Sequence, residues 1–331
     1  MASRDGNGWV TCELGHRHWG RYGAAGLLAY VADGGPVLLQ QRTWWSHHGG
    51  TWGLPGGARD SHESVLAAAL REAAEECGVP PGLVRPRGAF TDDHGGWSYT
   101  SVLALAASAF DVESDYDETE DVAWVQRADV PGMDLHPGLA ERWPQLSQAL
   151  DPLTIIVDGA NVVGSRPDGW WRDRAGAAAR LRDALEPLVL DGITHLPDES
   201  RSSSESRERG ERREPGEPDG EPGEHGGPGV DLAGPRRDWR TRRREATLRM
   251  TWLPEVVLVV EGAARSIADS NGTGGRVQVV AAQGSGDDTI AKLAEQVTGR
   301  RIVVTADREL RQRCQAAGAT VAGPGWLLGL L

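Results

Sequence analysis

The chain has 331 residues, of which 39% are hydrophobic and 25% charged, so it is too long for one typical core and suits two domains. Its formal net charge of -13 excludes a protein that coats nucleic acid through overall charge, although a local basic site is compatible with it. The stretch 1–8 is mostly polar and no apolar run is long enough to span a bilayer. We therefore expect a cytoplasmic protein without a membrane partner.

The cysteines are few and widely separated, which indicates no disulfide framework. Cys12 lies near His16 and His18, and these side chains could supply part of a zinc site. A closed zinc site needs four ligands, and the sequence offers no evident fourth. Zinc is therefore not expected here.

Two apolar stretches, 23–31 and 36–42, predict strands that lead into a glycine-rich turn at 53–57. The turn reads GLPGG, and its glycines allow backbone carbonyls to approach a cation closely. The polar run DSHES, with an approximate capping box, predicts the start of a helix that stops at Gly78.

This helix is expected to have two different faces. One buried stripe is predicted by apolar residues at steps of three and four: Leu66, Leu70, Ala73 and Cys77. An acidic cluster is predicted on another side: Glu72, Glu75 and Glu76. Such a cluster can be a plain solvated surface, since like charges there cost only about 0.2–0.5 kcal/mol. The preceding glycine turn favours instead a site for Mg²⁺ or Mn²⁺, which prefer oxygen ligands.

The stretch 57–79, GARDSHESVLAAALREAAEECGV, resembles the Nudix box of hydrolases that act on nucleoside-diphosphate-linked compounds. The defining positions of the box are all present: Glu63, Arg71, Glu72, Glu75, Glu76 and Gly78. The resemblance implies a metal-dependent pyrophosphohydrolase that uses Mg²⁺ or Mn²⁺. It also implies an α/β/α sandwich, which we place at residues 1–150.

The resemblance further implies roles for single residues. The implied metal ligands are Gly56, through its carbonyl, Glu72, Glu75 and Glu76. Glu72 would alternatively be the base that orients the attacking water. Arg71 and Glu63 complete the catalytic set, and would hold the helix and the loop in register rather than touch substrate.

After the box, strands are predicted at 98–107 and 122–126, followed by a helix from Gly138 that Pro144 could kink. Candidate substrate-binding residues in this part are Trp97, Tyr99, Glu118 and Glu120. The two aromatic rings could stack a base or form a packed strand edge, and one of the two glutamates could be a further ligand or base. His47 and His48 could contact phosphate or be exposed turn residues.

The box does not identify the substrate. The proline that follows it in ADP-ribose members is missing, and LLQQR at 38–42 meets the coenzyme A signature only in part. We expect a nucleoside triphosphate, normal or oxidised, to be hydrolysed to the monophosphate and pyrophosphate.

Residues 198–245 contain almost no large apolar side chains, so we expect a disordered polar insert. The basic run 236–249 is either a helix that contacts nucleic acid or the solvated start of a helix.

The remaining parts, 151–197 and 246–331, are expected to form a second domain. Strands at 154–157, 256–260, 277–281 and 302–305 alternate with helices, which predicts a mostly parallel sheet. Polar residues lie at or beyond the carboxyl ends of these strands, where ligands bind in such sheets: Asp158, Asn161, Glu261, Asp287, Asp288 and Asp307. Several carboxylates gathered there would favour a divalent cation.

The elements VDGANVV, GSGDDTIAKLA and VVTADRELRQR resemble the NYN/PIN-like nuclease domains, in that order. The resemblance implies that Asp158, Asp287 and Asp307 bind metal while Asn161 and Asp288 assist, with Glu261 as a fourth acid. The structural alternative is that Asp287 and Asp307 cap helices and that Asp158 belongs to a turn at the end of a strand, but the three residues in the family's order favour an acidic metal site.

Three hypotheses follow. The first is hydrolysis of small nucleotides, with a separate ribonuclease site in the second domain. The second couples the halves, so that a 5′-triphosphate RNA end is trimmed and the RNA is then cut. In the third, the second domain only binds nucleic acid or another partner.

Overall fold

The computed structural model describes residues 4–114, 118–167, 169–197, 245–268 and 276–331. The polar insert expected at 198–245 lies outside these residues except for Glu245, and so does most of the basic run 236–249.

The N-terminal part is built on a mixed sheet. Its strands are β3 (Ala24–Val31), β4 (Val37–Arg42), β5 (Trp52–Gly53), β6 (Gly56–Ala58), β7 (Val84–Asp93), β8 (Ser98–Ala106), β9 (Thr119–Val125) and β11 (Thr247–Trp252). The order is β11-β7-β8-β3-β4-β5, with β6 paired to β3 and β9 to β4. The central pair, β3 and β8, is parallel, whereas the other pairs in this sheet are antiparallel.

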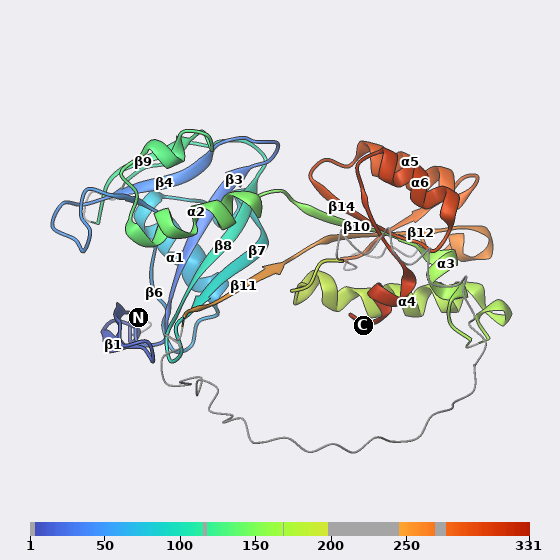
Figure 1. Cartoon of the computed structure of the whole chain (residues 1–331), viewed down its shortest axis with the longest axis horizontal. Coiled ribbons are helices and arrows are strands. Elements are labelled where there is room, and N and C mark those ends of the chain that lie inside the picture. The colour runs from blue at the N-terminus through green and yellow to red at the C-terminus, as the bar shows by residue number, and fades with distance from the viewer. Residues whose placement is uncertain (1–3, 115–117, 168, 198–244, 269–275) are drawn as a thin grey trace, which may run out of the picture. The chain divides into compact units, whose positions relative to one another are not determined.

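One helix covers each face of this sheet, α1 (Val65–Cys77) and α2 (Pro137–Gln148) (Figure 1). Successive side chains of a strand point to opposite faces of the sheet. Leu27 of β3 therefore packs in the hydrophobic cluster that includes α1, and Leu28 in the cluster that includes α2. The structure therefore confirms the α/β/α sandwich and the strands predicted before and after the box. It adds β7, which the sequence analysis missed because Pro86 and Gly88 interrupt its pattern.

Two short strands precede the sandwich, β1 (Trp9–Thr11) and β2 (Arg17–Trp19), and they form an antiparallel hairpin. Short 3-10 turns, η1 (Pro81–Leu83) and η2 (Val130–Gly132), connect the later elements.

The C-terminal part has a second sheet, in which every pair of strands is parallel. Its strands are β10 (Leu153–Asp158), β12 (Glu255–Val260), β13 (Gln278–Ala281), β14 (Arg300–Val304) and β15 (Thr320–Ala322). The order is β13-β12-β10-β14-β15, so the chain changes direction across the sheet at β10. A crevice at the carboxyl ends beside such a reversal is the usual ligand site of an open α/β sheet.

Helices cover both faces of the second sheet. They are α3 (Gly159–Gly164), α4 (Arg174–Leu190), α5 (Gly286–Gln296), α6 (Arg308–Ala316) and α7 (Pro324–Leu328), with 3-10 turns η3 (Trp170–Arg172) and η5 (Gly262–Ile267). The helices α4 and α5 lie on opposite faces (Figure 1). Leu181 of α4 packs with Ile155 on one face, whereas Ile290 of α5 packs with Ile156 on the other. The predicted parallel arrangement is confirmed. Within the described part of the chain, no helix has the length and apolar character needed to cross a membrane.

Strand β11 connects the two sheets along the chain. Its residues were predicted to belong to the second domain, but its backbone pairs with β7 of the first sheet, from Thr247 opposite Asp93 to Trp252 opposite Gly88. The open edge of β7 supplies the hydrogen-bonding groups that take up this strand.

Candidate active site

The helix of the box begins and ends at specific caps. The hydroxyl of Ser64 accepts a hydrogen bond from the backbone N–H of Ala67 at 3.1 Å. At the other end, Gly78 has a left-handed conformation with φ of 62°, which favours glycine. The predicted stop at Gly78 is therefore confirmed.

The buried face of α1 differs from the predicted stripe. Its buried residues are Ala68, Ala69, Ala73, Glu76 and Cys77. The prediction is wrong for Leu66, which is 38% exposed, because the small alanines rather than the leucine lie against the sheet. Glu76 is only 5% exposed, so this glutamate lies on the packed side of the helix and not among solvated charges.

The carboxylate of Glu76 is held by hydrogen-bond donors from two strands, β6 and β4. Its Oε2 accepts hydrogen bonds from the backbone N–H of Gly56 at 2.7 Å and from Nε2 of Gln40 at 3.0 Å. Gln40 is completely buried, and its Oε1 accepts a bond from the hydroxyl of Thr119 at 2.7 Å. Gln40 was not among the site residues predicted from the sequence. The available signal was a glutamine pair at the end of an otherwise apolar strand.

Burial controls the protonation of these acids. It raises the pKa of Glu76 to about 8, and the nearby charge of Glu72 acts in the same direction. Burial also raises the pKa of Glu72, against the opposing effect of Arg71. A cation among these carboxylates would favour their ionised forms.

Arg71 connects the acidic residues of the box. Its Nε and Nη2 donate to Oε1 and Oε2 of Glu63 at 2.7 and 3.0 Å, which forms a bidentate pair. Its Nη1 donates to Glu72 Oε1 at 2.7 Å and to Glu75 Oε2 at 3.2 Å. Arg4 also donates to Glu75 Oε2, at 3.0 Å. One guanidinium thus sets the positions of three glutamates.

The glycine turn allows these groups to meet. A Cβ on Gly57 would lie 2.8 Å from the carboxylate atoms of Glu72, and a Cβ on Gly56 would lie 2.5 Å from the carbonyl oxygen of Ala25. Neither space accepts a side chain without displacement. Glycine at these positions therefore serves close packing of backbone against carboxylate.

The donor set suits a hard divalent cation. It consists of the carboxylates of Glu72, Glu75 and Glu76 together with the backbone of Gly56, and all the available donors are oxygens. Among the described residues, these carboxylates are not gathered into a group of three within 4.8 Å. Mg²⁺ commonly takes one or two protein carboxylates and keeps several waters.

A cavity of about 370 Å³ lies beside this site, with Gly56 in its wall. Trp97 and Tyr99 both line it, as do His47 and His48. The Trp97 ring stacks on His18, with centroids 3.8 Å apart and planes at 5°. Burial, with the Glu76 charge, raises the pKa of Tyr99.

The two candidate glutamates on the acidic stretch are both exposed. The charge of Glu118 contributes to the raised pKa of both Glu72 and Glu76, although Glu118 does not line the cavity. Glu120 is exposed on β9 and does not line the cavity.

The polar residues of the second domain also meet in a cavity, of about 270 Å³ at the carboxyl ends of the parallel strands. Its polar lining residues are Asp158, Asn161, Glu261, Asp287 and Asp307. Asp288 does not line it, and its carboxylate instead accepts a bond from Arg313 at 2.8 Å.

Helix capping explains part of this arrangement. Asp158 caps α3 through the N–H of Asn161 at 3.0 Å, and Asp307 caps α6 through the N–H of Leu310 at 2.8 Å. Asp287 has no capping role, because Ser285 is the N-cap of α5.

The acids of this cavity affect one another. Burial raises the pKa of Asp158 and of Asp287, and the charges of Glu261 and Asp307 raise both further. The cavity thus concentrates negative charge at the point where the strand order reverses.

The chain is similar to several known proteins. A family model described as NUDIX domain matches residues 20–147. "Putative 8-oxo-dGTP diphosphatase 3" of Mycobacterium tuberculosis (strain ATCC 25618 / H37Rv) is 45% identical over 162 residues, which cover 46% of this chain and 72% of that protein. A "Nucleoside triphosphate pyrophosphatase/Nudix hydrolase fusion protein" of Bifidobacterium longum (strain NCC 2705) is 40% identical over 155 residues, covering 45% of this chain and 32% of that protein. The crystal structure of a Nudix hydrolase from M. smegmatis has 42% identity and a TM-score of 0.41, and the match covers 43% of this chain and 94% of that one.

Proposed function

This chain belongs to the Nudix hydrolase family, and from that premise we propose that residues 1–150 hydrolyse a nucleoside triphosphate, normal or oxidised in its base, to the monophosphate and pyrophosphate. The observation that carries the proposal is the buried Glu76 carboxylate, hydrogen-bonded to Gly56 and Gln40 at the edge of a 370 Å³ cavity. The relative described as an 8-oxo-dGTP diphosphatase supports the substrate class.

We propose that Glu75 and Glu76 hold the cation, together with the carbonyl of Gly56. When bound, Mg²⁺ or Mn²⁺ would supply Lewis acidity towards the phosphate oxygens. Glu72 is the further ligand or the group that takes the proton of the attacking water. Burial raises its pKa, so Glu72 accepts a proton more readily than an ordinary glutamate does.

The remaining residues position these groups. Arg71, paired with Glu63, keeps Glu72 directed at the glycine turn. Tyr99 and Trp97 form the wall on which the base would lie. Since His18 already covers one face of Trp97, a base would use the other face or the ring edge.

A substrate panel tests this function. The full chain with Mg²⁺ should release pyrophosphate from ordinary deoxynucleoside triphosphates or from 8-oxo-dGTP, and should act more weakly on ADP-ribose and coenzyme A. Turnover confined to ADP-ribose or coenzyme A would refute the substrate class. 5′-Triphosphorylated RNA in the same panel tests whether the two halves act together on RNA ends.

A second candidate function concerns the acidic cavity of the C-terminal part, 151–197 and 246–331. We propose that Asp158, Asp287 and Asp307 bind a divalent cation there and cleave RNA, with help from Asn161 and Glu261. The charges of Glu261 and Asp307 raise the pKa values of both Asp158 and Asp287 beyond the effect of burial, and this concentration of negative charge supports a cation site. When bound, the cation would supply charge to a phosphodiester group.

Asp287 is the sharpest place to test this second activity, because Asp158 and Asp307 also cap helices. Asp287→Asn should abolish cleavage of single-stranded RNA by the full chain with Mn²⁺. Asp288→Asn changes the neighbouring residue outside the cavity and should retain the cleavage. Equal rates for both variants and the unaltered chain, or no cleavage by the unaltered chain, would leave a binding role for this part.

A further inference from the structure

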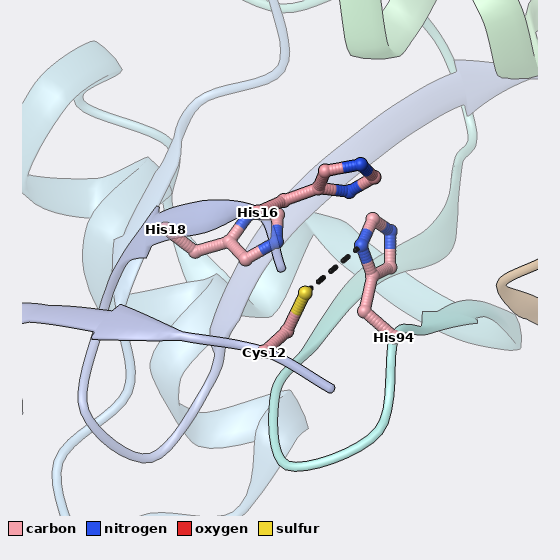
Figure 2. A group of neighbouring side chains, drawn as sticks. All are labelled: Cys12, His16, His18 and His94. Atoms are coloured by element: carbon pink, nitrogen blue, oxygen red, sulfur yellow. Dashed lines mark hydrogen bonds between the residues drawn. The ribbon is translucent and has the colours of Figure 1, made fainter. Parts of the chain in front are cut away.

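Four metal-ligating side chains from two hairpins meet at one point outside the acidic sites. They are Cys12, His16, His18 and His94, and one ligand atom from each lies within 4.8 Å of all the others. Figure 2 shows the four side chains turned towards one another, with the contact between Cys12 and His94. His94 is the fourth ligand that the sequence around Cys12 lacks.

The backbone holds these residues in place. Cys12 follows β1 directly, and its N–H donates to the carbonyl of His16 at 3.0 Å across the hairpin. His16 and His18 are two residues apart, which places their side chains on the same side of an extended chain. The N–H of Glu13 donates to the carbonyl of Gly95 at 2.9 Å, and this bond connects the hairpin to the loop that carries His94.

The distance between the ligand atoms of Cys12 and His94 is close to that of a tetrahedral site. Cys12 Sγ lies 3.9 Å from His94 Nδ1. In tetrahedral zinc with Zn–S of about 2.3 Å and Zn–N of about 2.1 Å, sulfur and nitrogen are about 3.6 Å apart. A movement of a few tenths of an ångström would thus suffice at this pair.

One ring nitrogen of this group of side chains lacks a hydrogen-bond partner. Nε2 of His18 is buried and has no hydrogen-bond partner among the described residues. A buried polar atom without a partner is unfavourable, and most such atoms in proteins are satisfied. Cys12 is also buried, at 5% exposure, so its sulfur is not a surface thiol.

A second layer of contacts fixes the histidine rings. Asp92 Oδ1 lies 3.2 Å from Nε2 of His94, on the side of the ring away from Cys12, and Asp92 Oδ2 accepts a bond from Arg142 at 2.7 Å. Asp92 Oδ1 has no hydrogen-bond partner among the described residues, and a bond donated by His94 would both satisfy this oxygen and orient the ring towards a metal. Trp97 stacks on His18 and fixes a second ring, while the third, His16, contacts the rings of His18 and His94 edge to face.

We propose that Cys12, His16, His18 and His94 bind one Zn²⁺ in a closed, structural site. A thiolate with three imidazoles suits zinc rather than Mg²⁺, which prefers oxygen. Four protein ligands leave no open position, so the ion joins the β1–β2 hairpin to the loop after β7 and takes no part in hydrolysis. His18, His94 and Trp97 line the 370 Å³ cavity, so the zinc also stiffens one of its walls.

Two other groups of histidines and acids lie close enough together to bind a metal, but neither supports a new site. His47, His48 and His136 belong to the cavity already described. In the group of Asp5, Asp60 and His62, both carboxylates already accept bonds, from Ser61 and from the N–H of Gly6.

Metal content and a cobalt spectrum test the site on the full chain. The purified protein should contain one zinc per chain by elemental analysis. After removal with a chelator it should take up one Co²⁺ with the intense visible bands of tetrahedral cobalt and a thiolate-to-cobalt charge-transfer band. Zn²⁺ should displace the cobalt, and Mg²⁺ should not.

Variants identify the ligands. Cys12→Ser should lose the charge-transfer band, and His16→Gln should weaken zinc retention against a chelator by about 10-fold or more. His16 is exposed, so its replacement leaves the fold intact, and His195→Gln, an exposed histidine elsewhere, is the matched control. The proposal is wrong if the unaltered chain binds cobalt only octahedrally or not at all, or if Cys12→Ser keeps the charge-transfer band. These outcomes leave the proposed hydrolysis untouched, because its rate with Mg²⁺ is measured separately.

Discussion

Glu76 Oε2 accepts a 2.7 Å hydrogen bond from the backbone N–H of Gly56, twenty residues earlier in the chain. This bond joins the last turn of α1 to the glycine turn at a position shielded from water. Glu76 is therefore both a packed residue of the helix and a charged member of the acidic site.

Replacing Glu76 with Gln should separate charge from packing. The amide oxygen can still accept the bond from Gly56, so the fold should be kept and the melting temperature without metal should not fall. Loss of the charge should lower kcat/KM with Mg²⁺ by on the order of 10²–10³. Glu120→Gln, on the exposed part of β9, is the control, and near-full activity of Glu76→Gln would contradict the site.

Arg71 should matter through geometry rather than charge alone. Arg71→Lys keeps the positive charge but cannot form the bidentate pair with Glu63 while reaching Glu72. We expect unfolding free energy to fall by about 2 kcal/mol and kcat to fall more than KM rises.

Arg4→Ala serves as the comparison for Arg71. It removes an exposed partner of Glu75 and should cost less than about 1 kcal/mol. Chemical denaturation and steady-state kinetics measure both variants, and equal losses would show that Arg71 has no special role.

A methyl group on Gly57 should disturb the site directly. Its Cβ would lie 2.8 Å from the Glu72 carboxylate, so Gly57→Ala should displace that group and reduce activity strongly. Gly82→Ala introduces the same methyl into open space and should leave activity unchanged. Activity assays on both variants test this expectation, and thermal melts verify that both variants fold. Equal activity would mean that Glu72 need not stay close to the turn.

The stability of the protein should depend on the protonation of His136. Burial, with the positive charges of His48, Arg42 and His47, lowers the pKa of His136 to about 4, below its ordinary value of 6.5. The folded state therefore resists protonation. The contribution of His136 is complete above pH 6.5 and is lost as the pH falls from about 6.5 towards 4.

His136→Asn isolates this effect. Nδ1 of His136 accepts a bond from the N–H of Gly138 at 3.2 Å, and the asparagine oxygen can replace it without titrating. The stability difference between the unaltered chain and the variant should shrink or reverse between pH 6.5 and 4. A difference independent of pH, measured by urea denaturation, would rule out this contribution.

The sequence alone predicted which residues lie close together in two cases. In one, the residues belong to a single helix, and in the other, a general rule for parallel sheets brings them together. Glu72, Glu75 and Glu76 lie within two turns of one helix, so their proximity needs no tertiary information. The C-terminal residues Asp158, Asp287 and Asp307 are far apart in sequence, yet the rule for parallel strands predicted that they would meet, and they line one cavity. Asp288 was grouped with them because neighbouring residues in sequence cannot be assigned to a helix face without the exact helix start.

Tertiary structure alone decided the rotation of α1 and the partners that reach it. Helical periodicity did not show that alanines would face the sheet and carry Glu76 inwards, because small residues contribute little to an apolar pattern. Gln40 reaches Glu76 only because β4 lies next to the box helix, and His94 reaches Cys12 only because two hairpins share the bond from Glu13 to Gly95. Such contacts depend on how separate elements pack, and local sequence carries no record of that packing.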